Sequence, residues 1–222
     1  MQVIEPLLIG SYQIIQDTEK YRFTSDSVHL ARFVAAKKGE VVADFCSGSG
    51  VVGLHFFAEN EKVAHVTLFE MNEELAAMSA KTVALNGLEE AFSVENVRLQ
   101  EIPARYTEHF SLILCNPPYE REGTGFENAS AEKAPCRKEL SLTLEELLDS
   151  AKRCLKFGGR FALIHRADRV AELLSALHAR NLEPKKLQFV AGKEGRKPYA
   201  VLVCAVKGGK TGVDVLPTLL NA

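Results

Sequence analysis

The chain has 222 residues, of which 46% are hydrophobic and 25% charged, and its formal net charge is −2. These are ordinary values for one soluble globular domain with a sizeable core. No apolar run approaches the ~20 residues that cross a bilayer. The N-terminus has no basic segment followed by an apolar core, so we expect no signal peptide and a cytoplasmic protein.

The five cysteines lie at positions 46, 115, 136, 154 and 204. Their number is odd, and no pair has the spacing of metal ligands or of a redox motif, so the sequence predicts reduced thiols and no metal site. Cys46, Cys115, Cys154 and Cys204 stand in apolar contexts, where core packing is the expected role.

Short apolar runs alternate with amphipathic stretches, a pattern that indicates a mostly parallel sheet covered by helices. Helices are expected over residues 26–37, 50–59, 73–86, 142–156 and 167–180. Strands are expected over residues 41–45, 64–69, 91–97, 110–115, 159–165, 185–191 and 199–206. The fold class is therefore α/β, a Rossmann-like sheet of seven strands with helices on both faces.

Several local signals refine these boundaries. Asn72 is a candidate cap for the third helix, and Thr143 with Glu146 has the spacing of a capping box. The pair Gly158-Gly159 is expected to end the helix before the fifth strand. The short loop 192–198 predicts an antiparallel hairpin between the last two strands, and the polar segment 120–140 predicts a long loop, of a kind that is often functional.

The strand 41–45 runs into the turn Cys46-Ser47-Gly48-Ser49-Gly50 and then into a helix. Strand, glycine turn and helix in this order are typical of nucleotide-type binding, because Gly48 and Gly50 permit close approach of the backbone. Gly53 completes the spacing of a dinucleotide-binding motif, so a dehydrogenase stays open as an alternative. Asp44 counts against it: a carboxylate here would repel a pyrophosphate but attract the ammonium of an amino-acid moiety.

Glu70 ends the second strand of this unit. A carboxylate at that position can accept hydrogen bonds from both hydroxyls of a ribose, and Met71 could then pack against an adenine face. The alternative is a solvated strand end. A third contact is expected just after the next strand, near Arg98.

Asn116-Pro117-Pro118-Tyr119 directly follows the apolar strand 110–115. The Asn116 side-chain oxygen and the Pro117 carbonyl could accept the two N–H bonds of an exocyclic amine, which orients the nitrogen lone pair toward a methyl donor. Tyr119 could stack on the planar substrate. The alternative is a simple turn, since Asn-Pro commonly starts one.

Charge is unevenly distributed along the chain. Residues 1–150 hold 13 Lys or Arg and 24 Asp or Glu, whereas residues 151–222 hold 14 and 5. This asymmetry suggests a basic face that could contact RNA phosphates, with solvated helix faces as the alternative. The candidate contacts around the last hairpin are Lys185, Lys186, Lys193, Arg196 and Lys197.

Taken together, three segments and the C-terminal tail carry a resemblance to a known family. They are residues 21–31 (Tyr-Arg-Phe-Thr-Ser-Asp-Ser-Val-His-Leu-Ala), residues 44–50, the tetrapeptide 116–119 and residues 199–209. From about residue 21 to 213 the chain resembles class I S-adenosylmethionine-dependent methyltransferases, and more narrowly the tRNA N6-adenine methyltransferases that modify the adenine beside the anticodon of a valine tRNA.

The resemblance implies one methyltransferase domain over residues 1–222, in which residues 1–37 cover the cofactor and residues 38–222 form the core. It implies S-adenosyl-L-methionine as cofactor, with contacts from Thr24 and Asp26 and, in the glycine turn, from Asp44, Phe45, Cys46, Ser47, Gly48 and Gly50. Glu70, Met71 and Asn116 complete the implied contacts. Arg98 departs from the family, which usually has an acidic residue there. The alternative for Thr24 and Asp26 is a helix cap, since Ser25, Asp26 or Ser27 could start the helix 26–37.

The tetrapeptide identifies the geometry at the nitrogen better than the acceptor molecule. The favoured acceptor is adenine N6 in RNA, with tRNA first; a protein-glutamine methyltransferase acting on a release factor and an rRNA guanine-N2 methyltransferase are alternatives. A non-catalytic nucleic-acid-binding module is a further alternative, against which the combination of Asp44, Glu70 and Asn116 counts.

Overall fold

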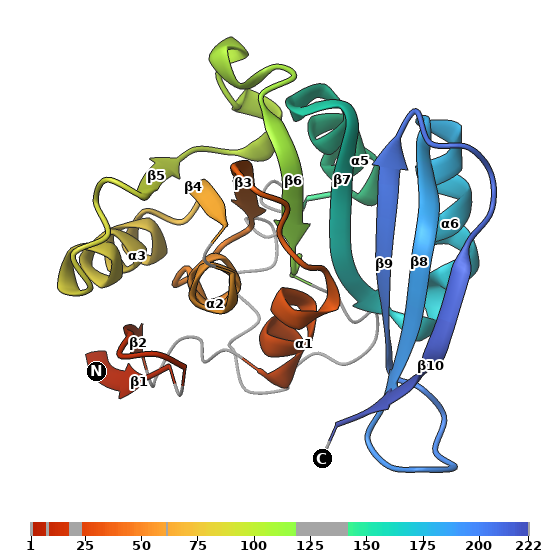
Figure 1. Cartoon of the computed structure of the whole chain (residues 1–222), viewed down its shortest axis with the longest axis horizontal. Coiled ribbons are helices and arrows are strands. Elements are labelled where there is room, and N and C mark those ends of the chain that lie inside the picture. The colour runs from red at the N-terminus through yellow and green to blue at the C-terminus, as the bar shows by residue number, and fades with distance from the viewer. Residues whose placement is uncertain (1, 8, 18–23, 61, 119–141, 222) are drawn as a thin grey trace, which may run out of the picture.

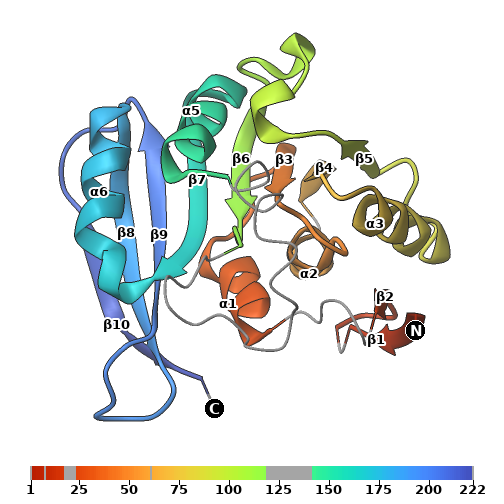
Figure 2. The same cartoon turned by 180° about the vertical axis from the view of Figure 1, so that it is seen from behind.

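The structure is a computed structural model that describes residues 2–7, 9–17, 24–60, 62–118 and 142–221. Figures 1 and 2 show a twisted central sheet with helices on both of its faces. The strands are β1 (Gln2–Pro6), β2 (Gln13–Asp17), β3 (Glu40–Phe45), β4 (Val63–Glu70), β5 (Phe92–Asn96), β6 (Phe110–Cys115), β7 (Leu155–Arg166), β8 (Leu182–Ala191), β9 (Ala200–Lys207) and β10 (Asp214–Leu220).

The helices are α1 (Ser25–Phe33), α2 (Val51–Glu59), α3 (Glu73–Leu85), α5 (Leu144–Cys154) and α6 (Val170–Ala179). Three short 3₁₀ turns are η1 (Leu99–Glu101), η2 (Ala104–Tyr106) and η4 (Ala167–Arg169). The five predicted helices are all present, although α1 ends at Phe33, earlier than the predicted residue 37.

The sheet has the order β10-β8-β9-β7-β6-β3-β4-β5. Its strands run parallel except β9, which is antiparallel to both β7 and β8. The seven predicted strands and the antiparallel β8–β9 hairpin are therefore confirmed. The prediction missed β10, which adds an eighth strand parallel to β8 at the edge, and it missed the separate hairpin β1–β2.

Alternation along β3 shows why both faces of the sheet carry helices. Val42 belongs to a buried cluster that includes side chains of α1 and α2, whereas Ala43 and Phe45 belong to a second cluster that includes side chains of α5 and α6. Successive strand side chains point to opposite faces. An almost wholly apolar strand is thus buried on both sides, as parallel sheets require.

Local signals account for the starts of α3 and α5. The Asn72 side chain accepts the Leu75 N–H, and Thr143 and Glu146 form both hydrogen bonds of the predicted capping box. The prediction for Gly158-Gly159 was wrong: α5 ends at Cys154, where the backbone turns extended at Leu155, and both glycines lie inside β7.

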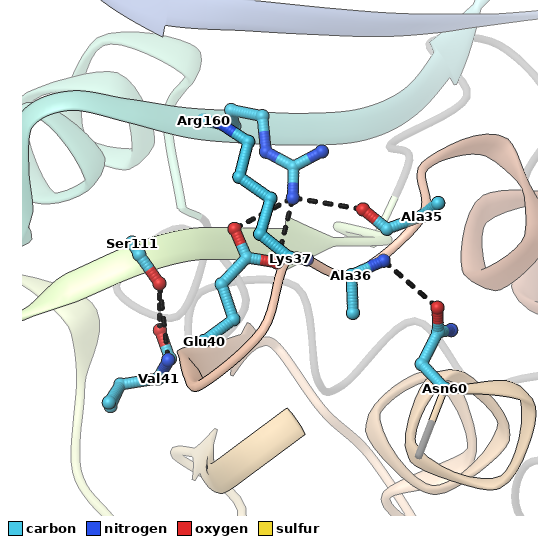
Figure 3. A network of polar contacts seen from close by, with 8 residues as sticks. All are labelled: Ala35, Ala36, Lys37, Glu40, Val41, Asn60, Ser111 and Arg160. Atoms are coloured by element: carbon cyan, nitrogen blue, oxygen red, sulfur yellow. Dashed lines mark hydrogen bonds and ion pairs between the residues drawn. The ribbon is translucent and has the colours of Figure 1, made fainter. Parts of the chain in front are cut away.

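A polar network anchors the chain between α1 and β3 (Figure 3). Arg160 Nη2, from β7, donates to both Glu40 carboxylate oxygens at 2.7 Å and to the Ala35 carbonyl at 3.0 Å. Glu40 also accepts the Lys37 N–H at 2.8 Å, and Asn60 accepts the Ala36 N–H at 2.9 Å. The network fixes the connection that follows α1.

Candidate functional site

The adjacent strands β3, β4 and β6 are parallel, so their carboxyl ends lie together at one end of the sheet. Ligands bind at this end in open α/β sheets. A cavity of about 330 Å³ lies there, within the ~300–1,000 Å³ of small-molecule sites. It is lined by Ser27, Cys46, Ser47, Gly48, Val51, Val52, Phe69, Glu70, Met71, Asn72, Leu75, Val97, Arg98, Leu99, Gln100, Asn116, Pro118 and Leu142.

The turn after β3 forms one wall of the cavity, because its backbone adopts left-handed conformations. Cys46, Gly48 and Gly50 have φ values of 57°, 56° and 85°, and Gly50 is the N-cap of α2. The third glycine of the motif has a packing role: a Cβ on Gly53 would stand 2.7 Å from Leu68 Cδ2. The glycine spacing thus brings α2 close to the sheet.

Glu70 joins the cavity to this turn. Its Oε2 accepts the Gly48 N–H and its Oε1 accepts the Asn72 N–H, both at 2.8 Å. The residue is only 7% exposed but lines the cavity. Each carboxylate oxygen has a second lone pair, so Glu70 can hold the turn and still accept hydroxyl donors from a bound ligand.

Asp44 lies beneath the turn and does not line the cavity, which differs from the predicted contact with an ammonium group. It is 0% exposed, and its Oδ2 accepts the Gly53 N–H at 2.8 Å. Its Oδ1 has no hydrogen-bond partner among the described residues. Burial raises the pKa of this carboxyl from 3.8 to about 7. The hydrogen bond from Gly53 lowers the pKa, and the nearby negative charge of Glu70 raises it further.

This raised pKa predicts a pH dependence of stability that Asp44→Asn should remove. The folded carboxyl keeps its proton up to about pH 7, whereas the unfolded one loses it near pH 4, so ionisation favours unfolding as pH rises between these values. We therefore expect the difference in free energy of unfolding, Asp44→Asn minus native, to be larger at pH 8 than at pH 5 by roughly 1–3 kcal/mol. Urea unfolding at both pH values measures it; an equal difference at both would contradict the raised pKa.

Asn116 lies where β6 ends and lines the cavity, and its Nδ2 donates to Ser27 Oγ at 3.2 Å. Pro117 is buried, and Pro118 is exposed and lines the cavity. The predicted stacking residue Tyr119 and the predicted loop 120–140 lie outside the described residues.

The remaining predicted cofactor residues divide into two groups. Cys46, Ser47, Gly48 and Met71 line the cavity. Four others do not line it: Phe45, Gly50, Thr24 and Asp26. Phe45 packs edge-on against Phe69 in the core, and Gly50 is the N-cap of α2. Thr24 is the exposed N-cap of α1, and Asp26 accepts a hydrogen bond from the Tyr199 hydroxyl. Direct contact with a cofactor stays a prediction for these four.

Sequence reasoning missed several cavity residues. Ser27 was considered only as part of a helix start, yet it touches Asn116. Gln100 and Leu142 carry no motif of their own, and only the position just after β5 would have pointed to Gln100. Arg98 does line the cavity, as its position after β5 predicted.

The predicted basic residues have different surroundings. Lys185 Nζ donates to the carbonyls of Lys210 and Gly212, and Lys186 Nζ donates to the Phe33 carbonyl at 3.2 Å while it lies over the Phe33 ring. Both lysines thus stabilise the fold. By contrast, residues 193, 196 and 197 of the basic group are exposed in the β8–β9 loop.

Two features are absent from the described part of the chain. No group of three or more His, Cys, Asp or Glu residues there is arranged to hold a metal ion. No helix in the same residues is both long and apolar enough to span a membrane.

Comparison with known proteins adds independent information. Residues 22–183 match the family model "Methyltransferase small domain". A tRNA1(Val) (adenine(37)-N6)-methyltransferase from Erwinia tasmaniensis is 27% identical over 190 residues, which cover 86% of this chain and 77% of the relative. The enzyme of the same name from Shewanella baltica is 28% identical over 183 residues, covering 80% and 75%.

Solved structures share the fold at lower identity. A predicted O-methyltransferase from Agrobacterium tumefaciens superposes with a TM-score of 0.69 at 23% identity, covering 88% of this chain and 86% of the other. P. horikoshii TYW2 in complex with MeSAdo superposes with a TM-score of 0.64 at 15% identity, covering 94% and 72%.

Proposed function

The chain belongs to the methyltransferase small domain family, and we propose that it transfers a methyl group from S-adenosyl-L-methionine to adenine N6 in tRNA. The observation that carries this proposal is the position of Asn116 beside the glycine turn and Glu70 in one cavity. A tRNA acceptor implies that the enzyme works in the cytoplasm.

The cavity residues fit S-adenosyl-L-methionine. Gly48 lines the cavity and has no side chain, so a ligand can approach its backbone closely. Glu70 retains acceptor capacity for the hydroxyls of a ribose. Phe69, Val97 and Leu99 supply apolar walls for a base. When bound, the cofactor supplies an electrophilic methyl group on a sulfonium sulfur.

The chain's own residues would act by orienting the acceptor nitrogen. An exocyclic amine is a weak nucleophile because its lone pair is conjugated with the ring. Asn116 Oδ1 and the Pro117 carbonyl would each accept one N–H, which localises the lone pair and fixes its direction. Transfer would break the sulfur–methyl bond, with its electron pair left on sulfur, as the N–C bond forms. The nitrogen would then be acidic and release its proton to water, so no general base is required and the rate should vary little around neutral pH.

The named relatives support adenine N6 of a tRNA over the other acceptors. Both enzymes carry the same activity in their names, and the chain covers three quarters or more of each. Glutamine in a release factor and guanine N2 in rRNA share the requirement for an oriented amine, and remain the second candidates.

The decisive test is methyl transfer to purified acceptors. The protein is incubated with labelled S-adenosyl-L-methionine and, separately, unmodified tRNA, rRNA fragments and a release factor. Mass spectrometry of digested nucleosides should find N6-methyladenosine in tRNA alone. Methylguanosine in rRNA or methylglutamine in the release factor would replace the proposed acceptor with that one.

Glu70→Ala should weaken binding of S-adenosyl-L-methionine by ~1–3 kcal/mol, the usual cost of removing a charged hydrogen bond. Calorimetry measures the affinity, and urea unfolding checks that the turn still folds. Glu73→Ala is the matched control, because Glu73 is an exposed carboxylate in the next helix. Equal affinities in the native and Glu70→Ala proteins, with folding intact, would rule out this contact.

The loop that joins β8 to β9 lies at the carboxyl end of β8 (Figure 1), which is also the carboxyl end of β6 and β7 because these three strands run parallel. The cavity lies at the same end of the sheet. Reversing the charges of Lys193, Arg196 and Lys197 should weaken tRNA binding and lower its salt slope by about one for each phosphate that the loop no longer neutralises. Filter binding across a salt series measures both quantities.

The matched control reverses Lys38, Lys152 and Lys156, which are exposed. They lie just before β3, in the last turn of α5 and at the start of β7, so they are at the amino end of the sheet, opposite the cavity. It changes the net charge equally but should leave the tRNA affinity near that of the native protein. An equally weakened affinity in both triple variants would mean that only total charge matters. A native affinity in the loop variant would assign its residues to solvated surface.

A further inference from the structure

Two residues far apart in sequence meet in the wall of the cavity. Asn116 Nδ2 donates to Ser27 Oγ at 3.2 Å, and the two residues are 89 positions apart. Both line the cavity. Ser27 is only 1% exposed, so its hydroxyl is shielded from water that could otherwise exchange with this contact.

The direction of this hydrogen bond matters for the chemistry. An asparagine side chain has one donor group and one acceptor group on the same planar amide. Turned by 180°, the amide would present N–H bonds to an amine that also presents N–H bonds, and no hydrogen bond could form. With Nδ2 on Ser27, the acceptor Oδ1 of this cavity-lining residue has no hydrogen-bond partner among the described residues and is available to a substrate amine.

Ser27 is itself held from outside its helix. The Asn221 Nδ2 donates to Ser25 Oγ at 2.9 Å, and the Asn221 Oδ1 lies 3.1 Å from His29 Nε2. The Tyr199 hydroxyl donates to Asp26 at 3.0 Å. Tyr199 lies just before β9 and Asn221 just after β10. Because the α1 N-cap residue makes no side-chain capping bond, these side-chain contacts are what anchors the first turn that carries Ser27.

We propose that Ser27 is a positioning residue: it holds the Asn116 amide in the orientation that accepts the substrate amine, and the contacts of Asn221 and Tyr199 hold Ser27 in place. The inference rests on the proposed role of Asn116 in methyl transfer. It extends the site beyond the tetrapeptide to α1 and to the C-terminal end of the chain.

The kinetic test compares Ser27→Ala in two backgrounds. In the native background, the single-turnover rate with unmodified tRNA should fall about tenfold, the usual effect of one neutral hydrogen bond, while the affinity for S-adenosyl-L-methionine stays within about twofold. In the Asn116→Ala background, the second change should have no further effect on the residual rate, because residues that act as a unit are not additive.

Two more variants separate positioning from packing. Ser27→Thr keeps the hydroxyl and should recover most of the rate. Ser79→Ala removes an equally buried helix hydroxyl away from the cavity, and should turn over at the native rate. A native rate in Ser27→Ala, an equal decrease in both backgrounds, or a decrease explained by weaker cofactor binding would overturn the proposal.

A measurement without substrate keeps this test separate from the proposed function. In protein labelled with ¹⁵N-asparagine, the side-chain amide resonance of Asn116 is identified by its absence in Asn116→Ala. It should shift and exchange faster with solvent in Ser27→Ala. An unchanged resonance would overturn the positioning role, whereas a native protein that is inactive on every tRNA would overturn the proposed acceptor only.

Discussion

Replacing Asn116 by Ala is expected to lower the rate of methyl transfer by about 10²–10³-fold, the usual cost of deleting one preorganised polar group in an active site. The variant lacks the acceptor that orients the amine, so the nitrogen keeps its planar conjugation. The affinity for S-adenosyl-L-methionine should barely change, because Glu70 and the glycine turn remain. Single-turnover transfer to unmodified tRNA and calorimetry measure the two effects.

Asn116→Asp is the informative companion variant. It keeps an oxygen acceptor at the same position and should retain more activity than Asn116→Ala. A near-native rate in Asn116→Ala would mean that the tetrapeptide is merely the turn that ends β6.

Arg160→Ala is expected to lower the free energy of unfolding by ~3–5 kcal/mol, the cost of leaving one charge of a buried ion pair without its partner. The Glu40 side chain is only 3% exposed and the Arg160 side chain 15%, so removing the guanidinium, whose contacts Figure 3 shows, leaves a carboxylate that solvent reaches poorly. For a chain of this size the melting temperature should fall by roughly 6–20 °C. Urea and thermal unfolding measure both quantities.

Arg32→Ala is the matched control, because the Arg32 side chain is 58% exposed in its ion pair with Glu59. Surface pairs contribute ~0–1 kcal/mol, so this variant should stay close to the native stability. Replacing Arg160 by Met together with Glu40 by Leu should restore most of the stability. Equal destabilisation in Arg160→Ala and Arg32→Ala would mean that the pair is not effectively buried.

The strands at the centre of the sheet were predictable because burial on both faces leaves them almost purely apolar. The strand β6 was predicted at its observed bounds, Phe110–Cys115. The edge strand β10 was missed because Pro217 interrupts it, and its side chains are mostly exposed. The strand β2 was missed because its five residues include three polar ones, and its place is set by contacts with α3, such as the Ile15 N–H donated to Thr82.

The candidate site was predictable only where sequence neighbours act together. The glycine turn and Asn116 each follow a strand, and Glu70 ends one. Parallel strands have their carboxyl ends at the same end of the sheet, so the meeting of these three groups could be anticipated. Ser27 could not be assigned to Asn116, because their contact depends on how α1 packs across the sheet. The depth of Asp44 beneath Gly53 was also invisible, since a carboxylate at a strand end looks the same whether it faces ligand or core.

The strand β8 carries the chain to the end of the sheet where the cavity lies, and the antiparallel strand β9 carries it away again. The loop between them has exposed residues at 192–197, and these contribute none of the described cavity lining. Exposed hairpin loops tolerate insertion and replacement far better than the strands that they join. We therefore expect this segment to accept substitutions and insertions without disturbing the residues that line the cavity, so that under the proposed function it could change the contacts with the RNA while the site stays the same.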